Sequence, residues 1–192
     1  VGSEMCIRDR SFGAGNGSFH QLMLTTSNLS LGSLNVWGGY NTSAGGAGVD
    51  GVGQAYDQRL RLDNMTVDIS GSATIRRGML YLTNTTMNVV GAITTNDAWN
   101  VFRADGSTVT TAAGIDFSNI ASIVELYGGT VTTPFIKVGN ASWSPSNTGL
   151  FLANGLTLIA SESTSDFIQV YRDGNPANRI NATIGGLSLI HI

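Results

Sequence analysis

Apolar and polar residues alternate in short segments that recur along most of the chain. The clearest segments are five residues long, at 60–64, 80–84, 102–106, 124–128, 150–154 and 170–174. Their starts are spaced 20, 22, 22, 26 and 20 residues apart. Alternation with a period of two predicts a β-strand with one buried face. The sequence therefore predicts a repeating, strand-based architecture.

Each position of the repeat suggests a structural role. The first is apolar in all six copies, and the third is apolar in all except the copy with Arg172. The fifth is always Asn or Gly, the residues that best tolerate a positive φ, which predicts a sharp bend. Thr follows two positions later in the first four copies, and a second short strand is expected there. The members of the bend column are Asn64, Asn84, Gly106, Gly128, Asn154 and Gly174.

A strand–bend–strand unit of this length cannot bury its apolar face alone. Stacking each unit on the next pairs the strands in parallel and builds one continuous core. The predicted fold class is therefore all-β, a parallel β-helix (β-solenoid) with coils of about 20–26 residues. An antiparallel β-sandwich with accidental repetition is the alternative.

The segment before the regular repeats is less periodic. Residues 29–36 alternate and could form a coil, but residues 38–53 are rich in glycine and predict a long loop. We therefore expect irregular first coils with a Gly-rich loop over residues 11–59 and a regular β-solenoid over residues 60–186.

The two ends resemble translated DNA. Residues 1–10 match the translation of a string that resembles a transposon-based sequencing adapter, and residues 187–192 match the translation of the reverse complement of a part of that string. A native N-terminus and a native C-terminal strand are the alternative. We expect both segments to be non-native, as with other artificial extensions. The only cysteine, Cys6, and one of the two histidines, His191, lie in them. The remaining segment would then be a metagenomic-type fragment, open at both ends, with His20 as its single histidine.

Composition narrows the function classes. Gly, Asn, Ser and Thr fill 80 of the 192 positions, and only 12% of residues are charged. The net charge of −3 gives no basic footprint, so nucleic acid is not an expected partner. No apolar run approaches the length of a membrane span.

The repeat register and the Gly-Gly-Thr-Val-Thr style of segments such as 128–132 resemble repeat-rich secreted bacterial β-solenoid surface proteins. Autotransporter passenger domains and exported proteins of the PEP-CTERM type are the nearest in style. The resemblance covers residues 60–174. It implies export to the extracellular space or bacterial cell surface, an adhesin-like or matrix role, and polysaccharide or other cell-surface and matrix components as partners.

The second repeat position should face outward if the first and third face inward. It contains aromatic and charged side chains that could stack on and hydrogen-bond a glycan. The candidate glycan-binding residues are Arg61, Tyr81, Arg103, Phe151 and Tyr171, with Glu125 in the same column. A solvated face in which Arg103 and Glu125 pair across coils is the alternative.

Two tryptophans share one position in the repeat. Trp99 and Trp143 both lie 19 residues after a coil start, Leu80 and Val124 respectively. They are further glycan-binding candidates, and packing beneath a loop is the alternative.

A single calcium-type nonapeptide occurs at residues 45–53. Gly46, Gly48 and Asp50 fit its pattern, but such sites take ligands from successive turns and no second copy adjoins this one. No cofactor is expected, with calcium as the only weak candidate.

An enzyme is not expected. The acidic residues are dispersed, and Asp63 and Asp105, each next to Asn or Gly, are best explained by turns. The predicted function is a fragment of an extracellular or cell-surface β-solenoid with a structural or adhesive role that could include glycan binding. The alternative is a non-catalytic fragment of a carbohydrate-active β-helix enzyme, a polysaccharide lyase or hydrolase.

Overall fold

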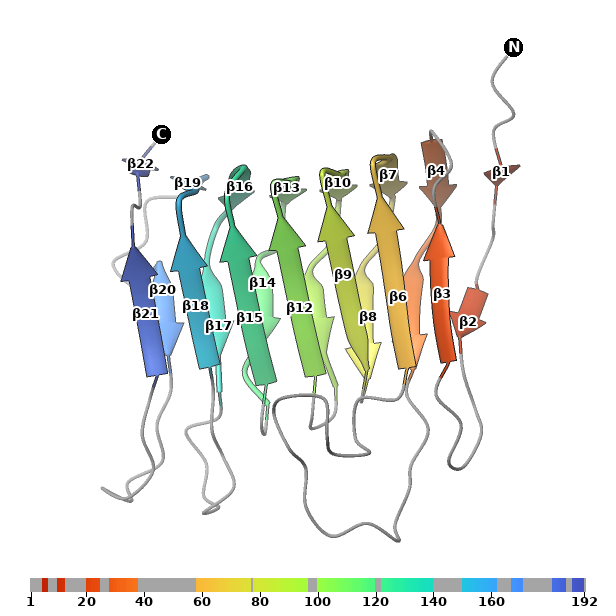
Figure 1. Cartoon of the computed structure of the whole chain (residues 1–192), viewed down its shortest axis with the longest axis horizontal. Helices are drawn as coiled ribbons and strands as arrows, with labels where there is room; N and C mark the ends of the chain where they lie inside the picture. The colour runs from red at the N-terminus through yellow and green to blue at the C-terminus, as the bar shows by residue number, and fades with distance from the viewer. Residues whose placement is uncertain are drawn as a thin grey trace, which may run out of the picture.

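The chain forms a stack of coils in which every paired strand runs parallel to its neighbours (Figure 1). A computed structural model describes residues 5–6, 10–12, 20–24, 28–37, 58–76, 78–96, 100–119, 122–139, 150–161, 167–170, 181–185 and 188–191. These residues contain strands and turns and no helix. None of them forms a helical segment that could cross a bilayer. The prediction of an all-β parallel β-helix is confirmed, and the antiparallel sandwich is excluded for this part of the chain.

Three sheets make up the described structure. Sheet A has eight strands: β1 (Met5–Cys6), β4 (Asn28–Leu31), β7 (Thr66–Ile69), β10 (Thr86–Val89), β13 (Thr108–Thr111), β16 (Thr130–Thr133), β19 (Thr157–Ala160) and β22 (Ser188–His191). Sheet B has seven: β2 (Arg10–Phe12), β5 (Leu34–Trp37), β8 (Ala73–Arg76), β11 (Ile93–Thr95), β14 (Ile115–Phe117), β17 (Ile136–Val138) and β20 (Ile168–Val170). Sheet C also has seven: β3 (His20–Leu24), β6 (Gln58–Asp63), β9 (Met79–Thr83), β12 (Asn100–Asp105), β15 (Ser122–Tyr127), β18 (Leu150–Asn154) and β21 (Asn181–Gly185).

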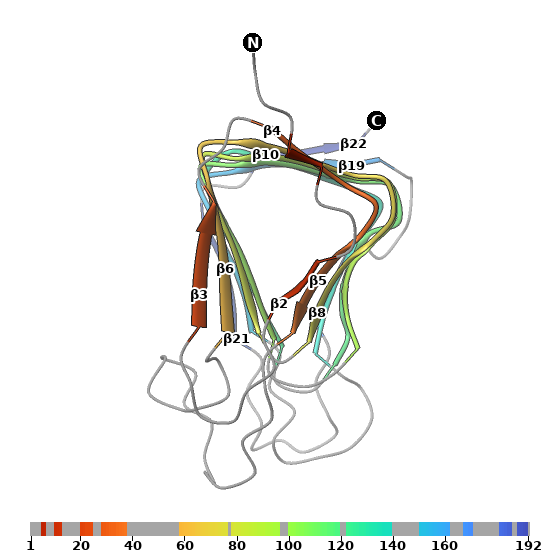
Figure 2. The ribbon, with the colours of Figure 1, turned by 90° about the vertical axis from the view of Figure 1, so that its right-hand side faces the viewer.

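Each coil runs through sheet C, then sheet A, then sheet B, and then returns to sheet C one step along the stack. Seen down the stack, the three sheets enclose a roughly triangular core (Figure 2). The sequence predicted two strands per coil, in sheets C and A, and the third strand in sheet B was not foreseen.

The core consists of inward-facing side chains aligned from coil to coil. In sheet C, the first inward column contains Leu60, Leu80, Phe102, Val124 and Phe151, all buried. Large and small side chains compensate within a coil, since Ala104 follows Phe102 and Ala153 follows Phe151 two residues later on the same face. Leu60 and Leu80 are instead followed by leucines. Side-chain volume is thereby roughly conserved between coils, as a densely packed interior requires.

The corner between sheets C and A is short and uniform. In the six coils from β6 to β21, two residues separate the two strands. Inter-coil backbone hydrogen bonds continue through this corner, from the N–H of Asn64 to the carbonyl of Thr83 (2.9 Å) and from Asn84 to Asp105 (2.9 Å). The stack therefore passes through the bend without a break in its hydrogen bonding.

Coil length varies chiefly at the corner between sheets B and C. Twenty residues separate β5 from β6, two separate β8 from β9, and eleven separate β17 from β18. In contrast, the sheet A to sheet B corner takes two or three residues in each coil except between β19 and β20, where it takes seven. Insertions gathered at one edge are typical of solenoids, in which that edge often adjoins the binding face.

Candidate functional site

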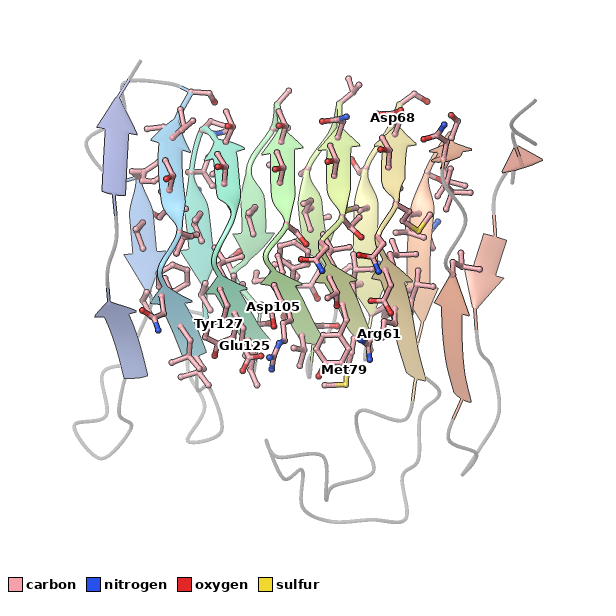
Figure 3. The ribbon with its side chains drawn as sticks, turned by 45° about the horizontal axis from the view of Figure 1, so that its top comes forward. Arg61, Asp68, Met79, Asp105, Glu125 and Tyr127 are labelled. Atoms are coloured by element: carbon pink, nitrogen blue, oxygen red, sulfur yellow. The ribbon has the colours of Figure 1, made fainter. Side chains whose placement is uncertain are left out.

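Four outward side chains form a row across neighbouring strands of sheet C. Arg61 pairs with Tyr81, Tyr81 with Arg103, and Arg103 with Glu125, each in direct register. All four are partly exposed, because they alternate with the buried residues of the same strands. The predicted alignment of these four residues is confirmed, and we call them the outer ladder. Figure 3 shows Arg61 and Glu125 on the same side of the molecule.

The expectation that Phe151 is exposed is wrong. Phe151 pairs with Val124 rather than with Glu125, and its side chain is 0% exposed. The structure shifts the repeat by one residue here, so that Leu152 takes the place next to Glu125. The residue that follows the outer ladder on the next strand is thus the aliphatic Leu152, and Phe151 belongs to the core.

The sixth repeat copy was also assigned to the wrong sheet. Val170 lies in β20 and pairs with Val138 of sheet B. The frame that placed Tyr171 in the outer ladder therefore does not hold, and Tyr171 itself lies outside the described residues. Other predicted candidates that also lie outside them are Trp99, Trp143, Gly46, Gly48 and Asp50.

Both arginines of the outer ladder bind a carboxylate on their own strand. The Nε atom of Arg61 lies 3.0 Å from Oδ1 and 2.9 Å from Oδ2 of Asp63. Arg103 donates from one terminal nitrogen to Asp105 (3.4 Å). Residues two apart on a strand share a face, which explains both pairs. The turn role expected for Asp63 and Asp105 is incomplete, since each also neutralises an arginine.

Arg103 has a second carboxylate partner on the next coil. Its other terminal nitrogen lies 3.4 Å from Oε2 of Glu125. The pairing of Arg103 with Glu125 across coils, expected under the alternative of a solvated face, is therefore present. Burial lowers the pKa of Arg103, but the charges of Glu125 and Asp105 and the hydrogen bond to Asp105 together raise it above its usual value.

Two tyrosines flank the guanidinium of Arg103. Its Cζ atom lies 5.0 Å from the ring centre of Tyr127 and 6.0 Å from that of Tyr81. Both distances fall within the range of cation–π attraction. Tyr127 was not among the predicted site residues. It follows Glu125 by two positions on the same strand, so the period of two could have identified it.

The ionisation of Tyr127 is suppressed. Burial raises the pKa of its phenol, and the negative charges of Glu125 and Asp105 raise it further, against an opposing effect of Arg103. Tyr127 is therefore neutral at physiological pH, and its hydroxyl is available as a hydrogen-bond donor and acceptor.

A shallow hollow lies between the strands β6, β9 and β12. It has a volume of about 310 Å³ and is lined by Arg61, Tyr81, Leu82, Thr83, Arg103 and Asp105. This volume is at the lower end for small-molecule sites. The lining combines guanidinium donors, carboxylate and hydroxyl oxygens and an aromatic ring, which are the groups that can contact a sugar.

An apolar strip supports the outer ladder from one side. Met79, Val101 and Ile123 precede the ladder residues by two positions, and all three are buried. Tyr81 packs against this strip. The strip therefore gives the Tyr81 ring an apolar surface to pack against.

The described residues contain no group of three or more acidic, histidine or cysteine side chains that could hold a metal ion. The contacts described above for the arginines of the outer ladder are ion pairs and cation–π contacts. In comparisons with known proteins, no family model, no curated protein and no solved structure matches this chain.

Proposed function

We propose that this chain is part of an extracellular or cell-surface β-solenoid that binds glycans with the outer face of sheet C. One observation carries the proposal: partly exposed arginine and tyrosine side chains stand in register on successive parallel strands. Strand spacing of about 4.8 Å gives such a row a regular repeat. An extended polymer with repeating hydroxyl groups is the kind of ligand that can contact several steps of the row.

Several features support an adhesive role. The low charge, the abundance of Gly, Asn, Ser and Thr, and the uniform coil stack are all consistent with a rigid extracellular spacer. The resemblance in repeat style to secreted bacterial surface proteins points in the same direction. In this role, coil number sets the reach of the protein and the outer ladder supplies the contacts.

The proposal assigns binding rather than catalysis to this face. Asp63, Asp105 and Glu125 each contact a guanidinium. Glycoside hydrolysis commonly requires a pair of carboxyl groups facing the bond that breaks. Carboxylates held in an arginine network fit a binding surface better. Release of reducing ends from a bound polysaccharide by this chain would contradict the assignment.

The test is binding of the whole chain to an array of polysaccharides, with the double variant Tyr81→Ala/Tyr127→Ala alongside. We expect the double variant to lose at least about tenfold in affinity, which corresponds to about 1.4 kcal/mol. Asn88→Ala is the matched control, because Asn88 is exposed on sheet A, away from the outer ladder.

Folding of each variant is checked by circular dichroism before binding is measured. Unchanged affinity in a folded Tyr81→Ala/Tyr127→Ala variant would contradict the role of the outer ladder. An equal loss in Asn88→Ala would assign binding to another face.

A further inference from the structure

Both guanidinium groups of the outer ladder are already occupied by carboxylates. Arg61 is bound by Asp63, and Arg103 is bound by Glu125 and Asp105. A bound anion would have to displace one of these partners or lie beside it. Like charges at such short range repel each other, and this repulsion is a means of rejecting the wrong ligand.

The charge balance of the face also disfavours an anionic ligand. Among the described side chains around the outer ladder, two arginines are matched by the three carboxylates of Asp63, Asp105 and Glu125. These described side chains therefore give the face no excess of positive charge to attract an acidic polymer.

The hydrogen-bond donors and acceptors that remain available on this face suit the hydroxyl groups of a sugar. A guanidinium has five N–H donors, and the contacts of Arg103 with Asp105 and Glu125 use one from each terminal nitrogen. The carboxylates keep free lone pairs, and Asp105 and Thr83 add oxygen atoms to the lining of the hollow. A sugar hydroxyl both donates and accepts, so it can use both kinds of group at once.

We propose that the outer face of sheet C selects uncharged glycans and rejects acidic ones, because its arginines are neutralised by carboxylates of the same face. This inference rests on the proposed glycan binding and specifies the ligand class. It also requires that binding be insensitive to salt, because no net charge is neutralised when an uncharged polymer binds.

The first experiment compares neutral hexose polymers with uronate polymers of similar length, at low and at physiological ionic strength. We expect at least tenfold tighter binding of a neutral polymer and less than a twofold change with salt. Equal or tighter binding of the uronate polymers would overturn the selectivity while leaving glycan binding in place. Binding of neither class would overturn the proposed function, and this inference with it.

The second experiment frees Arg103 with the double variant Asp105→Asn/Glu125→Gln. The exposed guanidinium should then bind uronates, with a gain of about tenfold or more that weakens as salt is raised. Asp68→Asn is the control, because it also removes a carboxylate but lies on sheet A and should give no gain. A folded double variant that gains no uronate binding would overturn the role assigned to the carboxylates.

Discussion

At the scale of single residues, the bend between sheets C and A follows from the conformations that Asn and Gly can adopt. Positive φ occurs at Asn64 (53°), Asn84 (47°), Gly106 (58°), Gly128 (63°) and Gly155 (63°). The predicted Asn or Gly column is thus correct in four coils and displaced by one residue in the fifth, where Gly155 rather than Asn154 adopts this conformation. Other residue types are disfavoured there because their Cβ atom approaches the following carbonyl oxygen.

Crowding makes a neighbouring glycine equally necessary. Gly129 has a φ of +72°, and a Cβ atom at this position would overlap the backbone carbonyl oxygen of Ser107 on the preceding coil. The close approach of coils at this corner therefore depends on both the conformation and the small size of glycine.

The environment of Tyr127 predicts a measurable pH effect. Its folded-state pKa lies above the ordinary value of 10.0, first because of burial and then because of the nearby carboxylates. The resulting contribution to folding stability is fully present below about pH 10 and is lost as the pH rises through the folded-state pKa. The measurement is a phenolate absorbance titration of the wild type and of Tyr127→Phe. The difference between the two titration curves reports the ionisation of Tyr127 alone.

We expect the midpoint of that difference curve to lie above 10. The variant Glu125→Gln should lower it, because it removes a negative charge next to the phenol. A Tyr127 midpoint at or below 10 in the folded wild type would contradict the structure of this face.

At the scale of the strand, register decides which side chains are in the core and which are on the surface. Shifting a strand by one residue exchanges its two faces. The repeat predicts β6, β9, β12 and β15 correctly because each of these segments has a polar residue between two apolar ones. Residues 150–153 are all apolar, so their alternation fits two registers, and the structure adopts the one that buries Phe151.

The dependence on register also explains which parts of the site the sequence could predict and which it could not. The positions of Arg61, Tyr81, Arg103 and Glu125 follow from the period of two and the repeat length. The contacts of Asp63 and Asp105 depend on side-chain rotamers, which the pattern does not specify. The segment 170–174 resembles a further copy of the sheet C strand because Val170 is apolar and Gly174 fits the bend column, but Val170 ends the three-residue strand β20 of sheet B.

The register of β18 predicts opposite sensitivities for two adjacent residues. Phe151→Ala should lower the free energy of unfolding by about 3–5 kcal/mol, because it leaves a cavity in the core. Leu152→Ala should cost about 1 kcal/mol or less, because this side chain is only partly buried. Denaturant unfolding monitored by circular dichroism provides both values. A larger loss of unfolding free energy for Leu152→Ala than for Phe151→Ala would contradict the register of β18.

At the scale of the whole molecule, the protein is a one-dimensional array in which each coil contacts chiefly its neighbours. In such arrays, stability is close to the sum of the coil and interface contributions. The matching geometry of Asn84 and Gly106, both at positive φ in successive bends, makes neighbouring coils interchangeable at this corner.

This additivity predicts that a complete coil can be removed. Deletion of residues 85–106 joins Asn84 to Ser107 and takes out one repeat of 22 residues. We expect a folded β-rich protein with a lower unfolding midpoint, measured by circular dichroism and thermal denaturation.

Deletion of residues 85–107 is the matched control. The two-residue corner cannot absorb the shift of one position, so the inward and outward faces of β13 would be exchanged.

The expected result of the control is loss of cooperative unfolding or aggregation, seen in light scattering. Equal behaviour of the two deletions would contradict a corner of fixed length.

The unequal corners also determine where the protein can change during evolution or in the laboratory. The corner between sheets C and A has two residues in every coil from β6 onward, and the corner between sheets A and B has two or three in all coils but one. The corner between sheets B and C, by contrast, accommodates two to twenty residues without altering the stack. Foreign peptides grafted at that edge would be displayed beside the outer ladder at intervals set by the coils. The fold thus combines a regular stack of coils with a row of loops of variable length at the corner between sheets B and C. New binding specificities could be added in these loops without changing the core.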